Sequence, residues 1–308
     1  MEIKQQINTS GIVLAITGIV LFSAKAVMVK LAYEYEINST HLLLFRMLFC
    51  CPFYIIIALR QKPTKPDAIG KRDYLWLMFF GFIGYYLASL FDFLGLQYIS
   101  AGLERIILFV YPTLVLLISK LFLGIKITRI QLVAILITYL GVLSTFCGDV
   151  STISDDLYLG GVLIFMSALT YAMYLVGSGW LLPKFGVLCF TSYAMLISTG
   201  CIVLQYLILD RTSLWDYPWQ IYALGVAMAI FSTLLPSFLV SGAISKMGAS
   251  NFSIFGSLGP ISTILLAYIF LDERLTSLQF VGASVVIVGV FVVTQKKNGS
   301  KATLNIKK

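Results

Sequence analysis

The two apolar segments between Gly248 and Val293 constrain the fold more than any other part of this sequence. Each is about 20 residues long, and a helix of that length crosses the hydrocarbon core of a bilayer, which is roughly 30 Å thick. Only the polar triplet Asp272-Glu273-Arg274 separates the two segments. We therefore predict a transmembrane helical hairpin in this region.

The stretch from Ser100 to Thr145 repeats the pattern of this hairpin at a constant offset of 148 positions, without a gap. The matches include proline, threonine, glutamine and glycine, which apolar composition alone does not explain. The matched pairs are Pro112 with Pro260, Phe122 with Phe270, Leu123 with Leu271, Thr128 with Thr276, Gln131 with Gln279 and Gly141 with Gly289. We predict an internal duplication, with a first repeat over residues 1–147 and a second over residues 148–308.

The composition predicts an all-α integral membrane protein. Apolar residues make up 59% of the 308 residues, charged residues only 12%, and the mean hydropathy is +0.93, whereas soluble domains contain about 25% charged residues. Ten transmembrane helices would use most of the chain and leave no room for a separate soluble domain. The predicted spans are Gly11–Ala32, His41–Leu59, Tyr74–Gln97, Leu103–Leu123, Ile130–Phe146, Tyr158–Trp180, Val187–Leu209, Gln220–Ile244, Ala249–Leu271 and Leu278–Val293.

Loop charges predict the orientation in the cell membrane. Lysine and arginine collect on the side of the two termini, as in the loop from Arg60 to Asp73, whereas the opposite loops are mainly acidic. By the positive-inside rule, both termini are cytoplasmic. Each repeat has five spans, an odd number, so the two five-helix repeats must be inverted relative to each other. Inverted repeats that enclose a midplane site are typical of secondary transporters.

Charged residues within the predicted spans of the first repeat mark a candidate site. Lys25, Arg46 and Asp92 all fall in the outward-facing half of their spans, where a buried charge needs a partner or water. We predict that they line a hydrated cavity for a polar substrate. Two alternatives stay open: Arg46 and Asp92 could pair only with each other, and Glu104 with Arg105 could be an interfacial anchor instead of a part of the cavity.

The second repeat offers hydroxyl groups where the first offers charges. Serines and tyrosines recur there at helical spacing, and Tyr85 shares the predicted helix face of Asp92. We predict that these side chains line the remaining walls, although each hydroxyl could instead bond to a helix carbonyl or join two helices. The predicted substrate-binding residues are Lys25, Arg46, Asp92, Tyr85, Tyr171, Tyr174, Ser237 and Ser257.

Two prolines near the middle of their spans are candidate hinges. Pro112 and Pro260 each remove a backbone donor and permit a kink. Glu273 on the short outer loop is a candidate gating residue, although a helix-capping role at the start of the last span is the favoured alternative. His41 is the only histidine, and the five cysteines lie mostly in apolar runs without metal spacing. We therefore expect no catalytic site, metal or cofactor, whereas proton coupling through His41 stays open.

The segment FLDERLT, from Phe270 to Thr276, resembles the EamA-type transporters, a family of the drug/metabolite transporter superfamily. The late lysine of the first span, the arginine of the second and the prolines of the fourth and ninth fit the same family. The resemblance implies transport of a metabolite or amino acid by alternating access without ATP hydrolysis. The first repeat departs from it, because FLGIKIT has Ile125 where the second repeat has Glu273.

We expect a secondary-active or facilitative transporter, not an enzyme, that exports a small polar metabolite. Lys25 and Arg46 outnumber Asp92, and a buried excess cation is unfavourable, so an anionic or zwitterionic, amino acid-like substrate is favoured. The alternative on the same fold is a flippase for lipid-linked cargo or an exporter of amphipathic drugs. The expected partners are the small-molecule substrate and the bilayer, with no nucleic acid, and the chain would act as a monomer or homodimer.

Overall fold

The computed structural model describes residues 9–124, 127–146, 155–210, 212–256, 258–271, 281 and 284–285. Every regular element in this part of the chain is helical, and seven helical segments are long and apolar enough to cross a membrane. Four of them run without interruption: α1 (Thr9–Tyr33), α2 (Ser39–Arg60), α8 (Asp155–Phe185) and α9 (Val187–Leu209). Apolar length therefore predicted these spans well, and α8 extends beyond the expected end at Trp180 because Leu181, Leu182 and Phe185 are buried.

Two spans contain a π-helical turn at equivalent positions. The first span consists of α3 (Lys71–Gly81), η2 (Phe82–Leu87) and α4 (Ala88–Tyr98), and the short helix η1 (Pro66–Ala68) precedes it. The second consists of α10 (Trp219–Ala229), η3 (Ile230–Leu234) and α11 (Leu235–Met247). The two π-helical turns begin 148 positions apart, at the offset of the sequence repeat. Such turns occur mainly at functional sites.

Two further spans are broken near their middle. The segment predicted as one helix from Leu103 to Leu123 is divided into α5 (Ala101–Leu108) and α6 (Tyr111–Leu123). Its counterpart is divided into α12 (Ala249–Phe255) and α13 (Leu258–Phe270). The prolines had predicted kinks near the middle of these spans, and the structure has a full interruption just before each proline. The break has a physical cause, because Pro112 in the first turn of α6 lacks an N–H and its ring clashes with a preceding helical turn.

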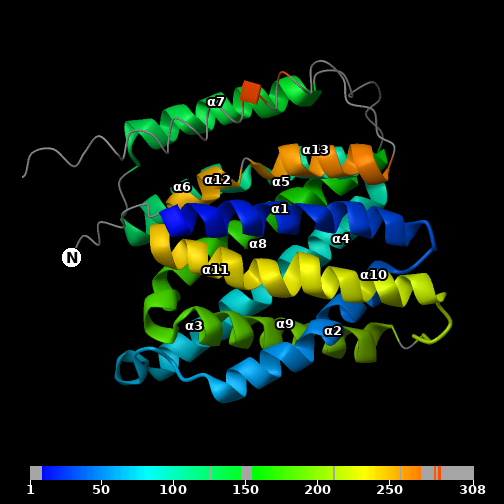
Figure 1. Cartoon of the computed structure of the whole chain (residues 1–308), viewed down its shortest axis with the longest axis horizontal. Coiled ribbons are helices and arrows are strands. Elements are labelled where there is room, and N and C mark those ends of the chain that lie inside the picture. Colours follow the sequence, from blue (N-terminus) through cyan, green and yellow to red (C-terminus); the bar gives the residue numbers. More distant parts are fainter. Residues whose placement is uncertain are drawn as a thin grey trace, which may run out of the picture.

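The helices form one bundle, with α7 (Arg129–Phe146) along one edge (Figure 1). Packing joins the two halves of the sequence: α4 lies against α8, α2 against α9, and α1 against α11 and α13. Small residues permit close approach. Gly84 lies directly against the ring of Tyr174 and Gly177 against that of Phe80, so neither glycine has room for a Cβ atom. The predicted tenth span falls almost wholly outside the described residues.

Candidate functional site

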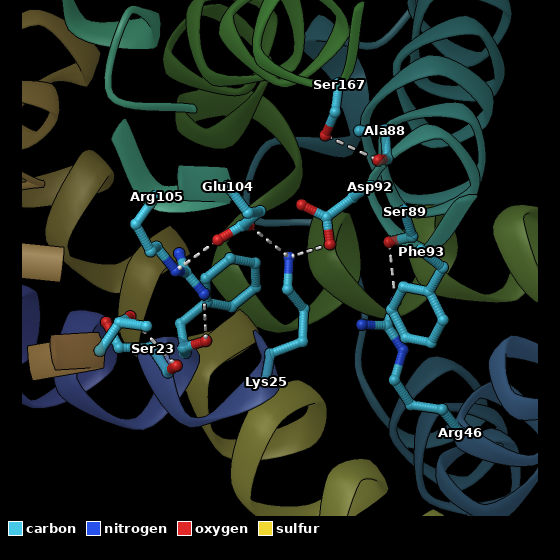
Figure 2. A network of polar contacts seen from close by, with 12 residues as sticks. Ser23, Lys25, Arg46, Ala88, Ser89, Asp92, Phe93, Glu104, Arg105 and Ser167 are labelled. Atoms are coloured by element: carbon cyan, nitrogen blue, oxygen red, sulfur yellow. Dashed lines mark hydrogen bonds and ion pairs between the residues drawn. The ribbon is translucent and has the colours of Figure 1, made fainter. Parts of the chain in front are cut away.

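Four charged side chains form a buried cluster between α1, α4 and α5. The Lys25 ammonium lies 2.6 Å from Asp92 Oδ2 and 3.9 Å from Glu104 Oε1, and Glu104 Oε2 lies 3.0 Å from Arg105 Nε. Figure 2 shows the Lys25 ammonium between the two carboxylates. None of the four side chains is more than 5% exposed. The arrangement alternates positive and negative charge, so each buried ion has a counter-ion.

Glu104 and Arg105 are part of this cluster and not an anchor at the membrane surface. The break after Leu108 leaves α5 inside the bundle, in contact with α8 and α13. Arg105 also donates a hydrogen bond from Nη2 to the Phe22 carbonyl, at 3.4 Å. The interfacial alternative for this pair is therefore wrong. The physical reason is that Lys25 and the Phe22 carbonyl of α1 lie within reach, so both side chains find polar partners inside the bundle.

Arg46 approaches the same region from α2 but has a different kind of neighbour. Its Nη2 donates to Ser89 Oγ at 2.7 Å, and its guanidinium lies 5.0 Å from the centre of the Phe93 ring. Within the described part of the chain, no carboxylate lies within ion-pair distance of Arg46. The alternative that Arg46 and Asp92 pair with each other is wrong, because the Asp92 carboxylate forms its ion pair with Lys25. Arg46 is 2% exposed and keeps its Nε without a hydrogen-bond partner in the described structure.

A central cavity joins Arg46 and Lys25. The space in it that water-sized molecules can occupy is about 30 Å³, and none of the residues that line it is exposed. The polar side chains on its walls are Lys25, Arg46, Tyr85, Ser89, Ser167, Tyr171, Ser232, Thr233 and Ser237. The two halves of the sequence therefore contribute different chemistry: the first gives the cations and the second mainly hydroxyl groups.

The structure places the predicted tyrosines in two roles. Tyr85 and Tyr171 line the central cavity, whereas Tyr174 is fully buried behind Tyr85 and donates to its hydroxyl at 3.1 Å. The Tyr171 ring also stacks on Phe22, with 6.1 Å between ring centres. Tyr85 is the fourth residue of the π-helical turn η2. Tyr174 thus supports Tyr85 from behind and does not itself line the cavity.

Among the predicted serines, Ser237 lies on the cavity wall and Ser257 falls outside the described residues. Ser237 is not free: its hydroxyl donates to the Leu234 carbonyl at 2.8 Å and lies 2.7 Å from the Tyr54 hydroxyl. Sequence reasoning missed Tyr54, although its spacing gave a signal. Tyr54 follows Arg46 by eight residues, about two helical turns, and so lies on the same face of α2.

A second cavity lies at the two helix breaks. The space in it that water-sized molecules can occupy is about 30 Å³, and its walls include Arg105, Phe109 and Tyr111 near the first break and Gly256 and Pro260 near the second. Pro260 therefore lies at this cavity, whereas Pro112 does not line it. The hinge function of both prolines stays a prediction. Glu273 lies outside the described residues.

A separate polar cluster surrounds His41 at the N-terminal end of α2. The His41 ring is 2.7 Å from the Tyr217 hydroxyl through Nδ1 and 3.1 Å from Asp210 Oδ2 through Nε2. Thr212 donates to Asp210 Oδ1 at 2.6 Å, and this hydrogen bond, with the nearby His41, lowers the pKa of the Asp210 carboxyl. Asn38 also donates to Asp210. His41 thus fixes the loop after α9 onto α2 and lies apart from the central cavity, whose lining does not include it.

A buried charged cluster beside a cavity with polar walls, inside a bundle of apolar helices of membrane length, is typical of a membrane transporter. Acidic and basic groups are expensive to bury in a membrane, so they are retained where they act on a substrate or an ion. Within the described residues, no group of three or more histidine, cysteine, aspartate or glutamate side chains could hold a metal ion.

The chain belongs to the EamA-like transporter family, whose sequence model matches residues 9–147 and again residues 158–295. It is 31% identical to the uncharacterized transporter YcbK of Bacillus subtilis (strain 168) over 289 residues, covering 92% of this chain and 91% of that protein. It is 28% identical to an uncharacterized transporter of Archaeoglobus fulgidus, with 80% and 84% covered. The chain is therefore a multi-pass membrane transporter and not an enzyme.

A solved structure shares the fold. It aligns with a TM-score of 0.74 over 96% of this chain and 100% of the other, at 15% sequence identity. An identity this low shows the likeness of the fold alone.

Proposed function

We propose that the protein is a secondary-active or facilitative carrier that exports a small anionic or zwitterionic metabolite, such as an amino acid. The observation that carries this proposal is the environment of Arg46. It is buried, it lines the central cavity, and its described neighbours are a hydroxyl and an aromatic ring instead of a carboxylate. A buried cation without a counter-ion is costly. A substrate carboxylate at Arg46 would remove that cost.

The charges of the buried cluster favour the same conclusion. Lys25, Arg46 and Arg105 are three cations, whereas Asp92 and Glu104 are two carboxylates, so the region carries one excess positive charge when all five groups are ionised. The planar guanidinium can bind a carboxylate through two parallel hydrogen bonds. An ammonium group on the same substrate could approach Asp92, which faces the Lys25 ammonium.

The proposed architecture is ten transmembrane helices in two inverted five-helix repeats, over residues 1–147 and 148–308. Two observations support it. The family model matches the chain twice in succession, and the starts of α3 and α10, of η2 and η3, and of α5 and α12 each differ by 148 positions. Both termini would be cytoplasmic in the cell membrane. The two repeats would then rock about the central cavity in alternating access.

The buried and half-buried lining of the central cavity favours a metabolite over a lipid. A flippase needs a lateral opening through which an amphipathic cargo enters, but the residues that line the central cavity are all buried or half-buried. Its polar walls also suit a compact polar substrate. The flippase or amphipathic-drug exporter remains the alternative proposal, and a lateral opening between helices in another conformation would favour it.

The test is ligand binding by purified Arg46 variants. Arg46→Lys keeps the charge but loses the paired hydrogen bonds, so we expect carboxylate binding to weaken roughly ten- to hundredfold, the equivalent of one hydrogen bond to a charged group. Arg46→Ala should nearly abolish binding. Arg60→Ala is the matched control, because Arg60 lies exposed at the other end of α2. Isothermal titration with a panel of amino acids and other small carboxylates gives the readout.

The alternative predicts the opposite ligand preference. Tight binding of lipophilic cations, no binding of carboxylates, and an Arg46→Ala protein that behaves like its parent would contradict the proposed function. A vesicle assay with substrate loaded on either side measures the direction of transport.

A further inference from the structure

The second cavity is lined mainly by apolar and aromatic side chains. Ile19, Phe109, Phe252 and Pro260 contribute to its walls, and it lies where both broken helices are interrupted. As in the central cavity, none of its lining residues is exposed. It is therefore a largely apolar space whose walls are buried and half-buried residues of the helix bundle.

The two cavities are neighbours. Phe22, Leu108, Tyr171 and Val240 line both of them, so these side chains lie where the two spaces adjoin. Figure 2 shows Lys25 between Arg105 and Ser23 on one side and Arg46 on the other. Ser23 and Arg105 line the second cavity, whereas Arg46 lines the central one. A single ligand could thus reach from Arg46 past Phe22 into the second cavity.

Arg105 and Ser23, two of the polar residues that line the second cavity, already have partners. Arg105 is paired with Glu104 and donates to the Phe22 carbonyl. The Ser23 hydroxyl lies 2.8 Å from the Ile19 carbonyl and 3.2 Å from the Gly259 carbonyl. A second charged group of a substrate would therefore have to displace existing bonds there. An apolar group only has to fill space against apolar walls.

Resting on the function proposed above, we propose that the substrate carries, besides the acidic group held at Arg46, an apolar or aromatic side group that occupies the second cavity. The transporter would thus discriminate between acids by the apolar side group, or tail, that each one carries. A short carboxylate such as acetate would fill the central cavity only. An acid with a longer or aromatic tail would gain affinity from the second cavity until that space is full.

The expected gain in binding affinity can be stated for each carbon atom of the tail. Burial of one CH₂ group contributes about 0.8 kcal/mol, which corresponds to about a fourfold lower Kd. Straight-chain monocarboxylates should therefore bind about fourfold more tightly with each added carbon that enters the second cavity. The rise should stop when this space is full, and longer chains should then bind more weakly.

Gly259 offers a way to fill the second cavity without touching the central one. A Cβ atom at Gly259 would lie 3.6 Å from Ser23 Oγ and 3.8 Å from Ile19 Cγ2, which are ordinary contacts, so a side chain can be accommodated there. Gly259→Leu then places its branched end in the cavity. Gly200→Leu is the matched control, because Gly200 lies on α9 with no atom within 4 Å of its Cβ position. Ile19→Phe fills the same cavity from another helix and serves if the Gly259 variant does not fold.

The experiment is titration calorimetry of the purified full chain with monocarboxylates from acetate to decanoate, with phenylpropionate, and with dicarboxylates of matched length. We expect a maximum at intermediate tail length in the parent and in Gly200→Leu. In Gly259→Leu or Ile19→Phe the preference for long tails should be lost, at least tenfold for the best acid, while the affinity for acetate stays unchanged.

Other results would overturn the inference. Carboxylate binding that depends on Arg46 but not on tail length removes the apolar subsite and leaves the proposed function intact. Dicarboxylates that bind more tightly than monocarboxylates of equal length would assign Arg105 to a second acidic group. Affinity that keeps rising to decanoate in the cavity-filling variants would indicate lipid-like binding elsewhere. No carboxylate binding by the parent would overturn both proposals.

Discussion

Lys25 is the residue on which the buried charges of the first half depend, because its ammonium contacts both Asp92 and Glu104. Those two carboxylates come from different helices, α4 and α5, so this one side chain of α1 links three elements. Removal of one partner from a buried pair leaves an uncompensated charge, whereas removal of both is far less harmful. The cluster should therefore respond very differently to single and double substitutions.

We expect Lys25→Met to destabilise the protein by about 3–5 kcal/mol, the usual cost of a broken buried pair. The double variant with Lys25→Met and Asp92→Leu should recover most of this loss. Thermal unfolding of the purified proteins in one detergent gives the comparison. Additive effects of the two substitutions would contradict the pairing at 2.6 Å.

The sequence predicted how deep in the membrane these charged residues lie, but not which residues they contact. Lys25, Arg46 and Asp92 were expected in one region because hydropathy fixes how far along a span each residue lies. Partner choice depends on how each helix is rotated about its axis, and hydropathy does not specify rotation. Arg46 therefore meets Ser89 and Phe93, while Asp92, one turn further on α4, meets Lys25.

At the scale of the elements, the predicted span Val187–Leu209 coincides with α9, but the interruptions of other spans were only partly foreseen. Pro112 and Pro260 indicated kinks, because proline lacks the donor that a continuous helix requires. The π-helical turns had no comparable signal. Their residues, Phe82–Leu87 and Ile230–Leu234, are as apolar as their surroundings, and the extra residue per turn becomes visible only through packing against other helices.

The loop after α9 allows a test of one polar contact between elements. Asp210 accepts hydrogen bonds from Thr212 and Asn38 and lies beside His41, so its carboxyl has a pKa below the ordinary value of 3.8. A lowered pKa in the folded state means that ionised Asp210 stabilises the fold above the ordinary value. This contribution is lost as the pH falls through the lowered pKa.

Asp210→Asn should therefore lower the melting temperature at neutral pH, and the difference from the parent should shrink below about pH 4. Asp216→Asn serves as the control, because Asp216 lies exposed in the same loop. Melting curves across pH 3.5 to 8 give the measurement. An equal difference at every pH would show that Asp210 acts through packing and not through its charge.

At the scale of the whole molecule, the inverted arrangement of the two halves can be tested by labelling. Single cysteines in place of Lys65 and Asp155, in a chain whose native cysteines have been replaced, should react with an impermeant thiol reagent from opposite sides of the membrane. Lys65 lies exposed in the loop after α2, and Asp155 is the first residue of α8. Labelling of both positions from one side would contradict the proposed inversion.

The narrowness of the central cavity also determines how fast a ligand can come and go. Because its lining residues are buried or half-buried and the space open to water-sized molecules is only about 30 Å³, we expect that helices must move apart before a metabolite reaches Arg46. Association is then limited by the frequency of opening, so its observed rate levels off at high solute concentration, and the apparent affinity is reduced by the fraction of molecules that are open. The time that a ligand stays bound would likewise depend more on how often the helix bundle opens than on the contacts at Arg46.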